Sequence, residues 1–261
     1  MLHIVVCAKV VMDPEAPVST FRIDTETRRA IPGQGIPPVL NPYDENSLEA
    51  ALKIKEQQPV KITVISAGKS VPKAIVRKCL AVGADNLIIL EDELFEEIDG
   101  YSSAYLLAAA VRKMGEYDLI LSGRMAADTN AGQVGPGLAE LLGVPNVTVA
   151  QSIEIKDGKA HVKRALADGC ETIEMSLPCL VTVSHEMGEL RSADIKGLMA
   201  AQKQPLTTWN ATDLEIDTTL IRQKTPRKLY IPEKDINCEL VTGETPEESG
   251  VNLAVKLRDQ I

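Results

Sequence analysis

Residues 118–143, with the sequence DLILSGRMAADTNAGQVGPGLAELLG, constrain the fold of this chain more than any other segment. They open with an apolar strand-like run at 119–121, pass through small and polar residues to Gly132, and continue as a helical pattern at about 133–142 that Gly143 ends. Such a strand–loop–helix unit is how α/β proteins bind phosphate, because backbone N–H groups and the positive helix end face the anion. A plain connecting loop without a ligand is an equal alternative for this segment.

The glycines of this segment do not follow either of two common nucleotide motifs. Gly132, Gly135 and Gly137 lack the G-x-G-x-x-G spacing of a dinucleotide fingerprint directly after the strand. No Gly-Lys-Ser/Thr sequence follows them, so the loop is not a Walker loop.

Strand and helix patterns alternate from the first residues to Gly143. Apolar strand-like runs stand at 2–9, 62–67, 86–90 and 119–121, and helical patterns at 71–82 and 101–114 lie between the later ones. This alternation predicts an α/β fold with a parallel sheet covered by helices on both faces.

A helix is predicted to begin after Asn41. Asn41 has the residue type of an N-cap, Pro42 suits the first helical position, and Asp44 lies in an acidic first turn. Capping by itself explains Asn41 and Asp44 without a ligand.

The chain after Gly143 is predicted to add a β-ribbon to one edge of the sheet. Short strands are expected at 146–155, 159–166 and 171–175, joined by Asp-Gly turns, with a further core strand at 180–183. In the proline-rich stretch 13–40, residues 21–23 and 30–31 suggest a small hairpin.

Two apolar helical stripes admit more than one interpretation. A helix at 192–202 carries Ile195, Leu198 and Met199, for which core packing is the simpler interpretation. Regular alternation is lost from residue 207, and a final helix at 247–260 shows an apolar stripe that lies either on this domain or on a partner.

Composition narrows the functional classes. The chain is 44% hydrophobic but only 3% aromatic, which favours α/β layers built from aliphatic residues. Its net charge of −9 argues against nucleic-acid and anionic-membrane partners, and no apolar run reaches membrane-spanning length. Five cysteines without a C-x-x-C pair fit reduced thiols and a cytoplasmic protein. Neither a metal site nor a catalytic nucleophile is expected from the three scattered histidines.

The chain resembles the small (beta) subunit of electron transfer flavoproteins almost end to end. The resemblance rests on VVCAKVV at 5–11, NPYDENSLEAALKIKE at 41–56, AVGAD at 81–85, SGRMAADTNAGQVGPGLAELLG at 122–143 and VKRALADGCETIEMSLPCLVTV at 162–183. One departure is Ala167, near which the family usually has an acidic residue.

The resemblance implies an adenine-nucleotide-binding domain, similar to universal stress proteins, at 1–205, and an extended C-terminal arm at 206–261 that contacts a larger alpha subunit. In the electron-bifurcating branch the beta subunit holds an FAD that is reduced by NADH. One electron then passes to the FAD of the alpha subunit and on to a dehydrogenase, and the other to ferredoxin or flavodoxin. In the housekeeping branch the same site holds structural AMP. The GRMAAD…GQVGP form is more similar to the bifurcating branch, so FAD is expected and AMP is the alternative.

The resemblance also implies which residues touch the nucleotide. They are Cys7, Asn41, Pro42, Tyr43, Asp44, Ala67, Gly123, Arg124, Met125, Ala126, Asp128, Thr129, Asn130, Ala131, Gly132, Gln133 and Val134. Backbone N–H groups of Gly132, Gln133 and Val134 would face phosphate, with Thr129 or Asn130 as added donors. Asp128 would take a ribose hydroxyl or cap the loop.

Arg124 is the permanent cation of the loop, and would form a surface ion pair or balance pyrophosphate and reduced-flavin charge. The small residues Ala126, Ala127, Ala131 and Gly132 leave room beyond an adenylate. Because redox chemistry belongs to the flavin, no catalytic residue is expected. The protein would be an electron carrier within a flavoprotein heterodimer.

By the same resemblance, residues 186–204 would dock an acyl-CoA or related dehydrogenase, with Ile195 near the apolar tip. This interpretation competes with core packing of the same helix. A rival of another class is an ATP-binding stress-type regulatory protein that transfers no electrons.

Overall fold

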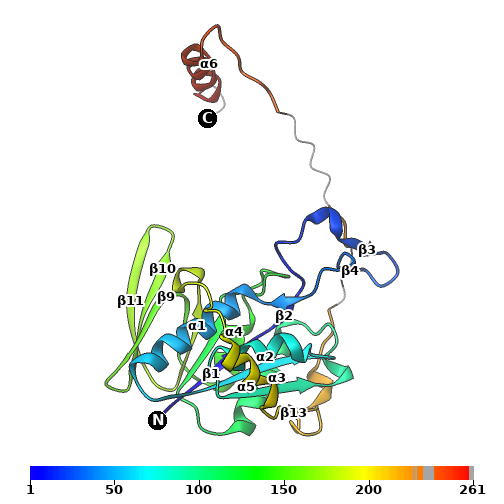
Figure 1. Cartoon of the computed structure of the whole chain (residues 1–261), viewed down its shortest axis with the longest axis vertical. Coiled ribbons are helices and arrows are strands. Elements are labelled where there is room, and N and C mark those ends of the chain that lie inside the picture. Colours follow the sequence, from blue (N-terminus) through cyan, green and yellow to red (C-terminus); the bar gives the residue numbers. More distant parts are fainter. Residues whose placement is uncertain (225, 227, 232–237, 259–261) are drawn as a thin grey trace.

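The structure, a computed structural model, describes residues 1–224, 226, 228–231 and 238–258. Its centre, within these residues, is a nine-stranded sheet in the order β11-β10-β9-β12-β8-β1-β6-β7-β13 (Figure 1). The inner strands β1 (Leu2–Cys7), β6 (Val60–Gly68), β7 (Asn86–Glu91), β8 (Leu119–Gly123) and β12 (Cys179–Val183) pair in parallel. They are continuous apolar runs because both sheet faces are covered, and the expected parallel sheet is confirmed.

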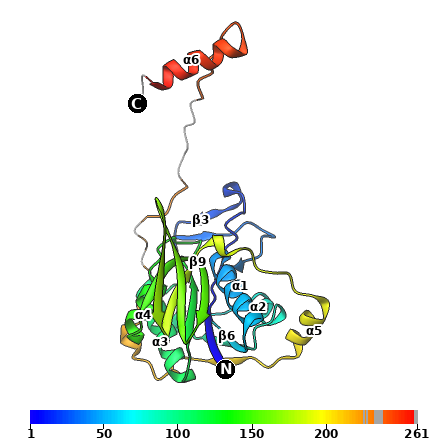
Figure 2. The same ribbon diagram turned by 90° about the vertical axis from the view of Figure 1, so that its left-hand side faces the viewer.

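Helices cover both faces of the sheet. Figure 2 shows α1 (Pro42–Gln57), α2 (Lys73–Ala81) and α5 (Ile195–Lys203) on one side, and α3 (Gly100–Met114) and α4 (Val134–Leu142) on the other. Alternate residues of β1 serve the two layers, since Ile4 and Val6 pack with the α1–α2 core and Val5 and Cys7 with the α3–α4 core. The predicted three-layer α/β architecture is therefore correct.

The predicted β-ribbon is present at one edge of the sheet (Figure 2). β9 (Asn146–Lys156), β10 (Lys159–Leu166) and β11 (Gly169–Ser176) are antiparallel, and β9 joins the sheet beside β12. Asp157 and Gly158 turn the first hairpin with φ of 50° and 72°, the values that an Asp-Gly turn supplies. The small hairpin of β3 (Arg22–Asp24) and β4 (Arg29–Ile31) also forms, next to a short pair of β2 (Val10–Val11) and β5 (Val39–Leu40).

The chain stays with the sheet beyond residue 205. β13 (Thr207–Trp209) pairs in parallel with β7, and Ala211 and Leu214 are buried in the α3–α4 core. Neither was expected, because three residues without apolar alternation give no strand signal. The segment that leaves the domain therefore begins later than residue 206.

The last described helix, α6 (Pro246–Arg258), stands clear of the sheet in Figures 1 and 2. None of its described side chains is buried. The helix predicted at 247–260 is confirmed as far as residue 258, and its last two residues lie outside the described ones. In the described part of the chain, no helix combines the length and apolarity that crossing a bilayer requires.

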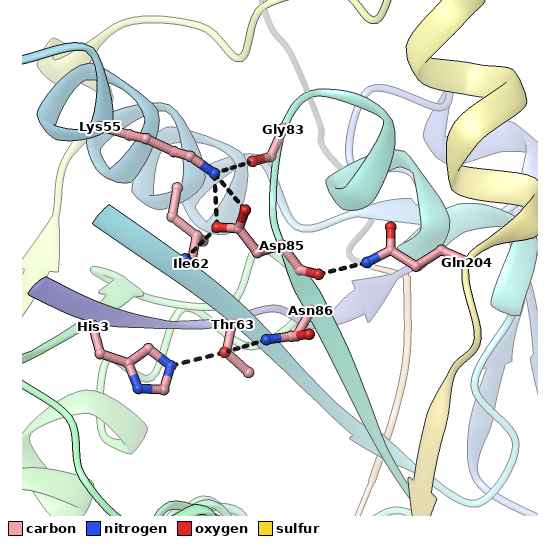
Figure 3. Close-up of polar contacts among 8 residues, drawn as sticks. All are labelled: His3, Lys55, Ile62, Thr63, Gly83, Asp85, Asn86 and Gln204. Atoms are coloured by element: carbon pink, nitrogen blue, oxygen red, sulfur yellow. Dashed lines mark hydrogen bonds and ion pairs between the residues drawn. The ribbon is translucent and has the colours of Figure 1, made fainter. Parts of the chain in front are cut away.

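Polar side chains tie together the amino ends of the central strands (Figure 3). The Asp85 carboxylate accepts hydrogen bonds from Lys55 Nζ and Ile62 N, both at 2.7 Å, and its backbone carbonyl accepts one from Gln204 Nε2. The Thr63 hydroxyl lies 2.8 Å from His3 Nε2 in the same layer. These contacts join α1, β6 and the end of α5. The polar groups at the amino ends of the central strands therefore bond to one another and serve the fold.

Candidate functional site

The residues of the predicted site lie at the other end of the same strands, their carboxyl ends. The chain passes from β1 to β6 and β7 on one side, and then returns to β8 on the other side of β1. Open α/β sheets bind ligands beyond the carboxyl ends of their strands, at such a reversal of strand order. Cys7 and Gly123 end β1 and β8 here, and Ala67 lies one residue before the end of β6. The structure thus brings these predicted residues from separate strands together at the carboxyl ends of the sheet.

Asn41 occupies the N-cap position of α1, as predicted, but its side chain does not cap the helix. Its side chain makes no capping bond to any described residue of the helix. Instead Nδ2 donates to the Met125 carbonyl and Oδ1 accepts from Ala127 N, both at 3.0 Å. The predicted N-cap position is therefore confirmed, but the side chain does not cap, because the loop after β8 offers the amide both an acceptor and a donor. Pro42 occupies the first helical position as predicted.

Asp44 joins the ends of β1 and β8. Oδ2 accepts from Lys9 N at 2.7 Å, and Oδ1 accepts from Gly123 N at 3.0 Å. The side chain is buried, and burial raises the pKa of its carboxyl group to about 7, although the bonds from Lys9 and Gly123 act to lower it. Helix capping does not explain this residue, because its partners are Lys9, which follows β1, and Gly123 at the end of β8.

Two glycines are required by close contacts between elements. A Cβ on Gly123 would lie 2.5 Å from Asp44 Oδ1 and 2.7 Å from Tyr43 Cβ, so only glycine lets α1 begin against β8. A Cβ on Gly135 would lie 2.5 Å from Thr182 Cγ2, which fixes the start of α4 against the sheet. Part of the glycine content of this segment therefore serves packing.

The loop between β8 and α4 is tightly turned and open to solvent. Thr129 N and Asn130 N donate to the Ala126 carbonyl at 3.1 and 2.8 Å, and Gly132 has a φ of 62°. Asp128, Thr129, Asn130, Ala131 and Gln133 are exposed. At the start of α4, Gln133 makes no side-chain cap within the described structure, and Pro136 has no N–H, so Val134 and Gly135 carry the helix N–H groups that lack such a cap.

Asp128 forms an ion pair with Lys9, which follows β1, at 2.6 Å between Nζ and Oδ2. Loop capping, one of its two predicted roles, is not what the structure shows, and the ribose contact stays a prediction. Lys9 is a functional candidate that the sequence did not reveal. Its position directly after a strand was a signal, but its partner is 119 residues away in the chain.

Arg124 is held against Tyr43 and forms no surface ion pair with the residues that the structure describes. Its guanidinium carbon lies 4.8 Å from the centre of the Tyr43 ring, and Nη2 donates to the Tyr43 hydroxyl at 3.2 Å. Arg124 Nε is buried without a hydrogen-bond partner among the described residues, and so are the hydroxyls of Ser66 and Ser122 near the ends of β6 and β8. Buried polar atoms without partners at the mouth of a site fit a ligand rich in acceptors.

Cys7 lies at the edge of this site as a neutral thiol. Burial raises the pKa of the Cys7 thiol to about 12, and the charge of Asp44 contributes in the same direction. It therefore offers packing and not a nucleophile. Ala67 packs against the α3–α4 core, and Met125 and Ala126 are half-buried in the loop.

The predicted docking segment 186–204 is fixed at its base by α1. Lys53 Nζ donates to the Met187 carbonyl and Asn46 Nδ2 to the Gly188 carbonyl, both at 2.6 Å. Arg191 makes a bidentate ion pair with the buried Glu49, at 2.8 and 3.0 Å. The segment therefore leaves the sheet in a defined direction.

The small residues of α5 pack on α2. Ala201 is buried, and a Cβ on Gly197 would lie 2.3 Å from the Ala81 carbonyl oxygen. Ile195, Leu198 and Met199 are 78%, 46% and 57% exposed. Core packing of these three residues, the simpler interpretation of the sequence, is wrong.

Comparison with known proteins agrees with this arrangement. Residues 33–214 match the electron transfer flavoprotein domain. The caffeyl-CoA reductase-Etf complex subunit CarD of Acetobacterium woodii is 36% identical over 264 residues, which cover 99% of both chains. The electron transfer flavoprotein subunit beta of Thermoanaerobacterium thermosaccharolyticum is also 36% identical, again over 99% of both chains. Protein FixA of Azotobacter vinelandii is 34% identical over 83% of this chain and 78% of its own. The chain is a member of the beta-subunit family of electron transfer flavoproteins.

Proposed function

We propose that this chain binds FAD at the carboxyl ends of β1 and β8 and acts as the beta subunit of an electron-bifurcating flavoprotein. The complex would take electrons from NADH and divide them between the FAD of the alpha subunit, which serves a dehydrogenase, and ferredoxin or flavodoxin. The observation that carries the proposal is the Arg124 guanidinium, which is stacked on Tyr43 with a buried Nε lacking a described partner, on the loop that leads to the uncapped start of α4. A cation and N–H groups without a side-chain cap together suit a diphosphate.

Each part of the site has a proposed role. The N–H groups of Gly132, Gln133 and Val134 would bind the diphosphate, and Asp128 would leave Lys9 for a ribose hydroxyl. Thr129 and Asn130 are exposed on the loop and would add side-chain donors. The bound flavin would supply the redox chemistry, so the chain's own residues bind and orient it.

The partners follow from surfaces away from this site. Electron transfer flavoprotein beta subunits pair with an alpha subunit. We propose that the arm starting after residue 224 contacts that subunit through α6. We also propose that 186–204 docks a CoA-ester flavin dehydrogenase through the exposed side chains of α5. By its name, the relative CarD is part of a complex with a caffeyl-CoA reductase, which supports a partner of this class. The proposed compartment is the cytoplasm.

Nucleotide content tests the proposal directly. The chain would be co-expressed with its alpha subunit, and the visible spectrum and the released FAD and AMP would be quantified per heterodimer. We expect two FAD and no AMP, and NADH-dependent reduction of ferredoxin only when a CoA-ester acceptor is present. One FAD with one AMP would replace bifurcation by the structural-AMP role. A colourless homodimer that binds ATP would favour a stress-type regulatory protein.

A matched variant pair locates the nucleotide. Arg124→Ala should lower the FAD retained by the beta subunit about tenfold, because it removes the cation of the site. Arg112→Ala, a change of the same residue type on α3, should leave FAD content unchanged. Equal FAD loss in both variants would contradict the placement.

A further inference from the structure

The first turn of α1 forms hydrogen bonds with backbone groups at the ends of β1 and β8, two neighbouring strands of the sheet. Asn41 N donates to the Lys9 carbonyl at 2.8 Å, and Lys9 N donates back to Asp44 Oδ2 at 2.7 Å. On the other side, Gly123 N bonds to Asp44, and Met125 and Ala127 bond to Asn41, all at 3.0 Å. One helical turn thus fixes the end of β1 and the first residues of the nucleotide loop.

We propose that Asn41 and Asp44 are positioning residues, which hold the backbone of 123–127 in its binding shape before any nucleotide arrives. They would act on the nucleotide through this backbone and not by touching it. The proposal rests on the proposed function only for the identity of the ligand. It differs from the role that resemblance gives these two residues, namely direct contact with the nucleotide.

The side-chain chemistry at the two positions matches the backbone groups that they meet. Asp44 faces two N–H donors, and a carboxylate can accept from both with one oxygen each. An amide at this position would turn its NH2 group toward one of those N–H groups. Asn41 faces one donor and one acceptor, Ala127 N and the Met125 carbonyl, which suits an amide and not a carboxylate.

Burial leaves these side chains little freedom for another partner. Asn41 is 1% and Asp44 is 7% exposed. Both Asp44 oxygens and both polar atoms of Asn41 are already bonded to the backbone. A preorganised loop binds its ligand more tightly, because the ordering cost has been met during folding.

We call the arrangement in which Asn41 and Asp44 hold the backbone of 123–127 the template. The template is sensitive to pH near neutrality. Burial raises the pKa of Asp44 to about 7, and protonation would turn one accepting oxygen into an O–H donor that faces an N–H group. The groups around Asp44 are Lys9 after β1, Cys7 on β1 and Cys79 on α2. The two thiols stay neutral there, because burial raises the pKa of each to about 12. Near neutral pH, Asp44 is then the group among these whose charge changes at the ends of β1 and β8.

Two isosteric substitutions and one control test the template in the full-length chain. Asp44→Asn mimics the protonated form, and Asn41→Asp removes the donor to Met125 while keeping the acceptor for Ala127. Glu45→Gln is the matched control, because Glu45 is the adjacent carboxyl of the same turn and interacts with Lys78 of α2.

Hydrogen exchange of residues 119–133 would be measured without nucleotide, and FAD would then be titrated into each protein. We expect faster exchange and about tenfold weaker FAD binding for Asp44→Asn and Asn41→Asp, and no change for Glu45→Gln. The FAD affinity of the natural chain should fall toward that of Asp44→Asn as pH is lowered through about 7, while Asp44→Asn shows no such dependence.

Each outcome decides the proposal. Weaker FAD binding with unchanged exchange would mean that Asp44 touches the nucleotide, and unchanged exchange and affinity would mean that the template does not exist. If the natural chain binds no FAD while the variants still lose protection, the proposed function fails and the template stands. Should Asp44→Asn not fold, the exchange and affinity of Asn41→Asp decide alone.

Discussion

Gly123 lies where α1 comes closest to β8, and its missing side chain is a structural requirement. A Cβ there would meet Asp44 Oδ1 at 2.5 Å and the Tyr43 backbone carbon at 2.8 Å. Gly123→Ala should therefore lower the free energy of unfolding by about 1–3 kcal/mol, the usual cost of overpacking. Urea unfolding measures it, with Gly169→Ala as control, because no described heavy atom lies within 4 Å of a Cβ at that position. Equal stability of both variants would show that α1 can shift away from β8 to make room for a Cβ at position 123.

Asp44 should leave a signature in the pH dependence of stability. Its folded pKa of about 7 lies above the ordinary aspartate pKa of 3.8, so the folded state binds the extra proton between these values. Its contribution is complete below the lower pKa and is lost as pH rises through about 7, at up to about 1.4 kcal/mol per pH unit.

The comparison with Asp44→Asn isolates this effect, since the other titrating groups are common to both proteins. Urea unfolding from about pH 5 to pH 8 should show the natural chain losing stability relative to the variant as pH rises. A difference that stays constant, or that grows in favour of the natural chain, would contradict the raised pKa of Asp44.

At the scale of elements, the Arg191–Glu49 pair holds the docking segment on α1. Arg191→Met would leave the Glu49 carboxylate buried without its partner, so the free energy of unfolding should fall by about 3 kcal/mol. Glu56→Gln removes only the exposed partner of Arg191 and should cost less than about 1 kcal/mol. Urea unfolding tests both. The double variant Glu49→Leu/Arg191→Met should recover most of the loss, and failure to recover would assign it to other contacts of Arg191.

The exposed face of α5 should matter for docking and not for stability. Ile195→Ser and Met199→Ser should change the free energy of unfolding by less than about 0.5 kcal/mol, because both side chains are exposed. They should raise the KM for the partner dehydrogenase about tenfold, the effect of losing an apolar anchor. Ala201→Leu, on the buried face of the same helix, should instead destabilise the fold. Normal KM values in both Ser variants would contradict docking through α5.

What the sequence predicts well is local. Continuous apolar runs identified the buried strands, and Asp157-Gly158 identified the hairpin turn. Features that depend on distant partners could not be predicted from the sequence. The Asn41 side chain bonds to a loop residue 84 positions away and does not cap its helix. Gly197 and Ala201 of α5 face α2, because a small residue at 197 lets the two helices come close. The loop after β8 was predicted from its own residues, but the Lys9–Asp128 pair across it was not.

At the scale of the molecule, α1 holds both of the proposed functional regions. Its first turn holds the nucleotide loop through Asn41 and Asp44, and its later turns hold the docking segment through Glu49 and Lys53. The proposed flavin site and the proposed docking surface are thus built on one rigid element.

Unlike α1, the helix α6 of the C-terminal arm does not bury its described side chains on the domain. Val251, Leu253, Val255 and Leu257 of α6 are 61%, 46%, 45% and 50% exposed, and an apolar face of this kind gains stability only when it is covered. Truncation after residue 224 keeps β13 and the Lys224 N to Glu97 carbonyl bond of 2.7 Å. It should change the free energy of unfolding of the α/β domain by less than about 0.5 kcal/mol, because no described side chain of α6 is buried.

The same truncation should abolish co-purification with the alpha subunit, because it removes α6, whose described apolar side chains are not buried by this chain. Truncation after residue 205 is the contrasting control, since it also deletes β13 and the buried Ala211 and Leu214 and should destabilise the domain itself. Size-exclusion chromatography of co-expressed subunits separates the two effects. An intact heterodimer after the shorter deletion would place the alpha-subunit interface on the α/β domain, and a domain destabilised by that deletion would mean that α6 packs on its own chain.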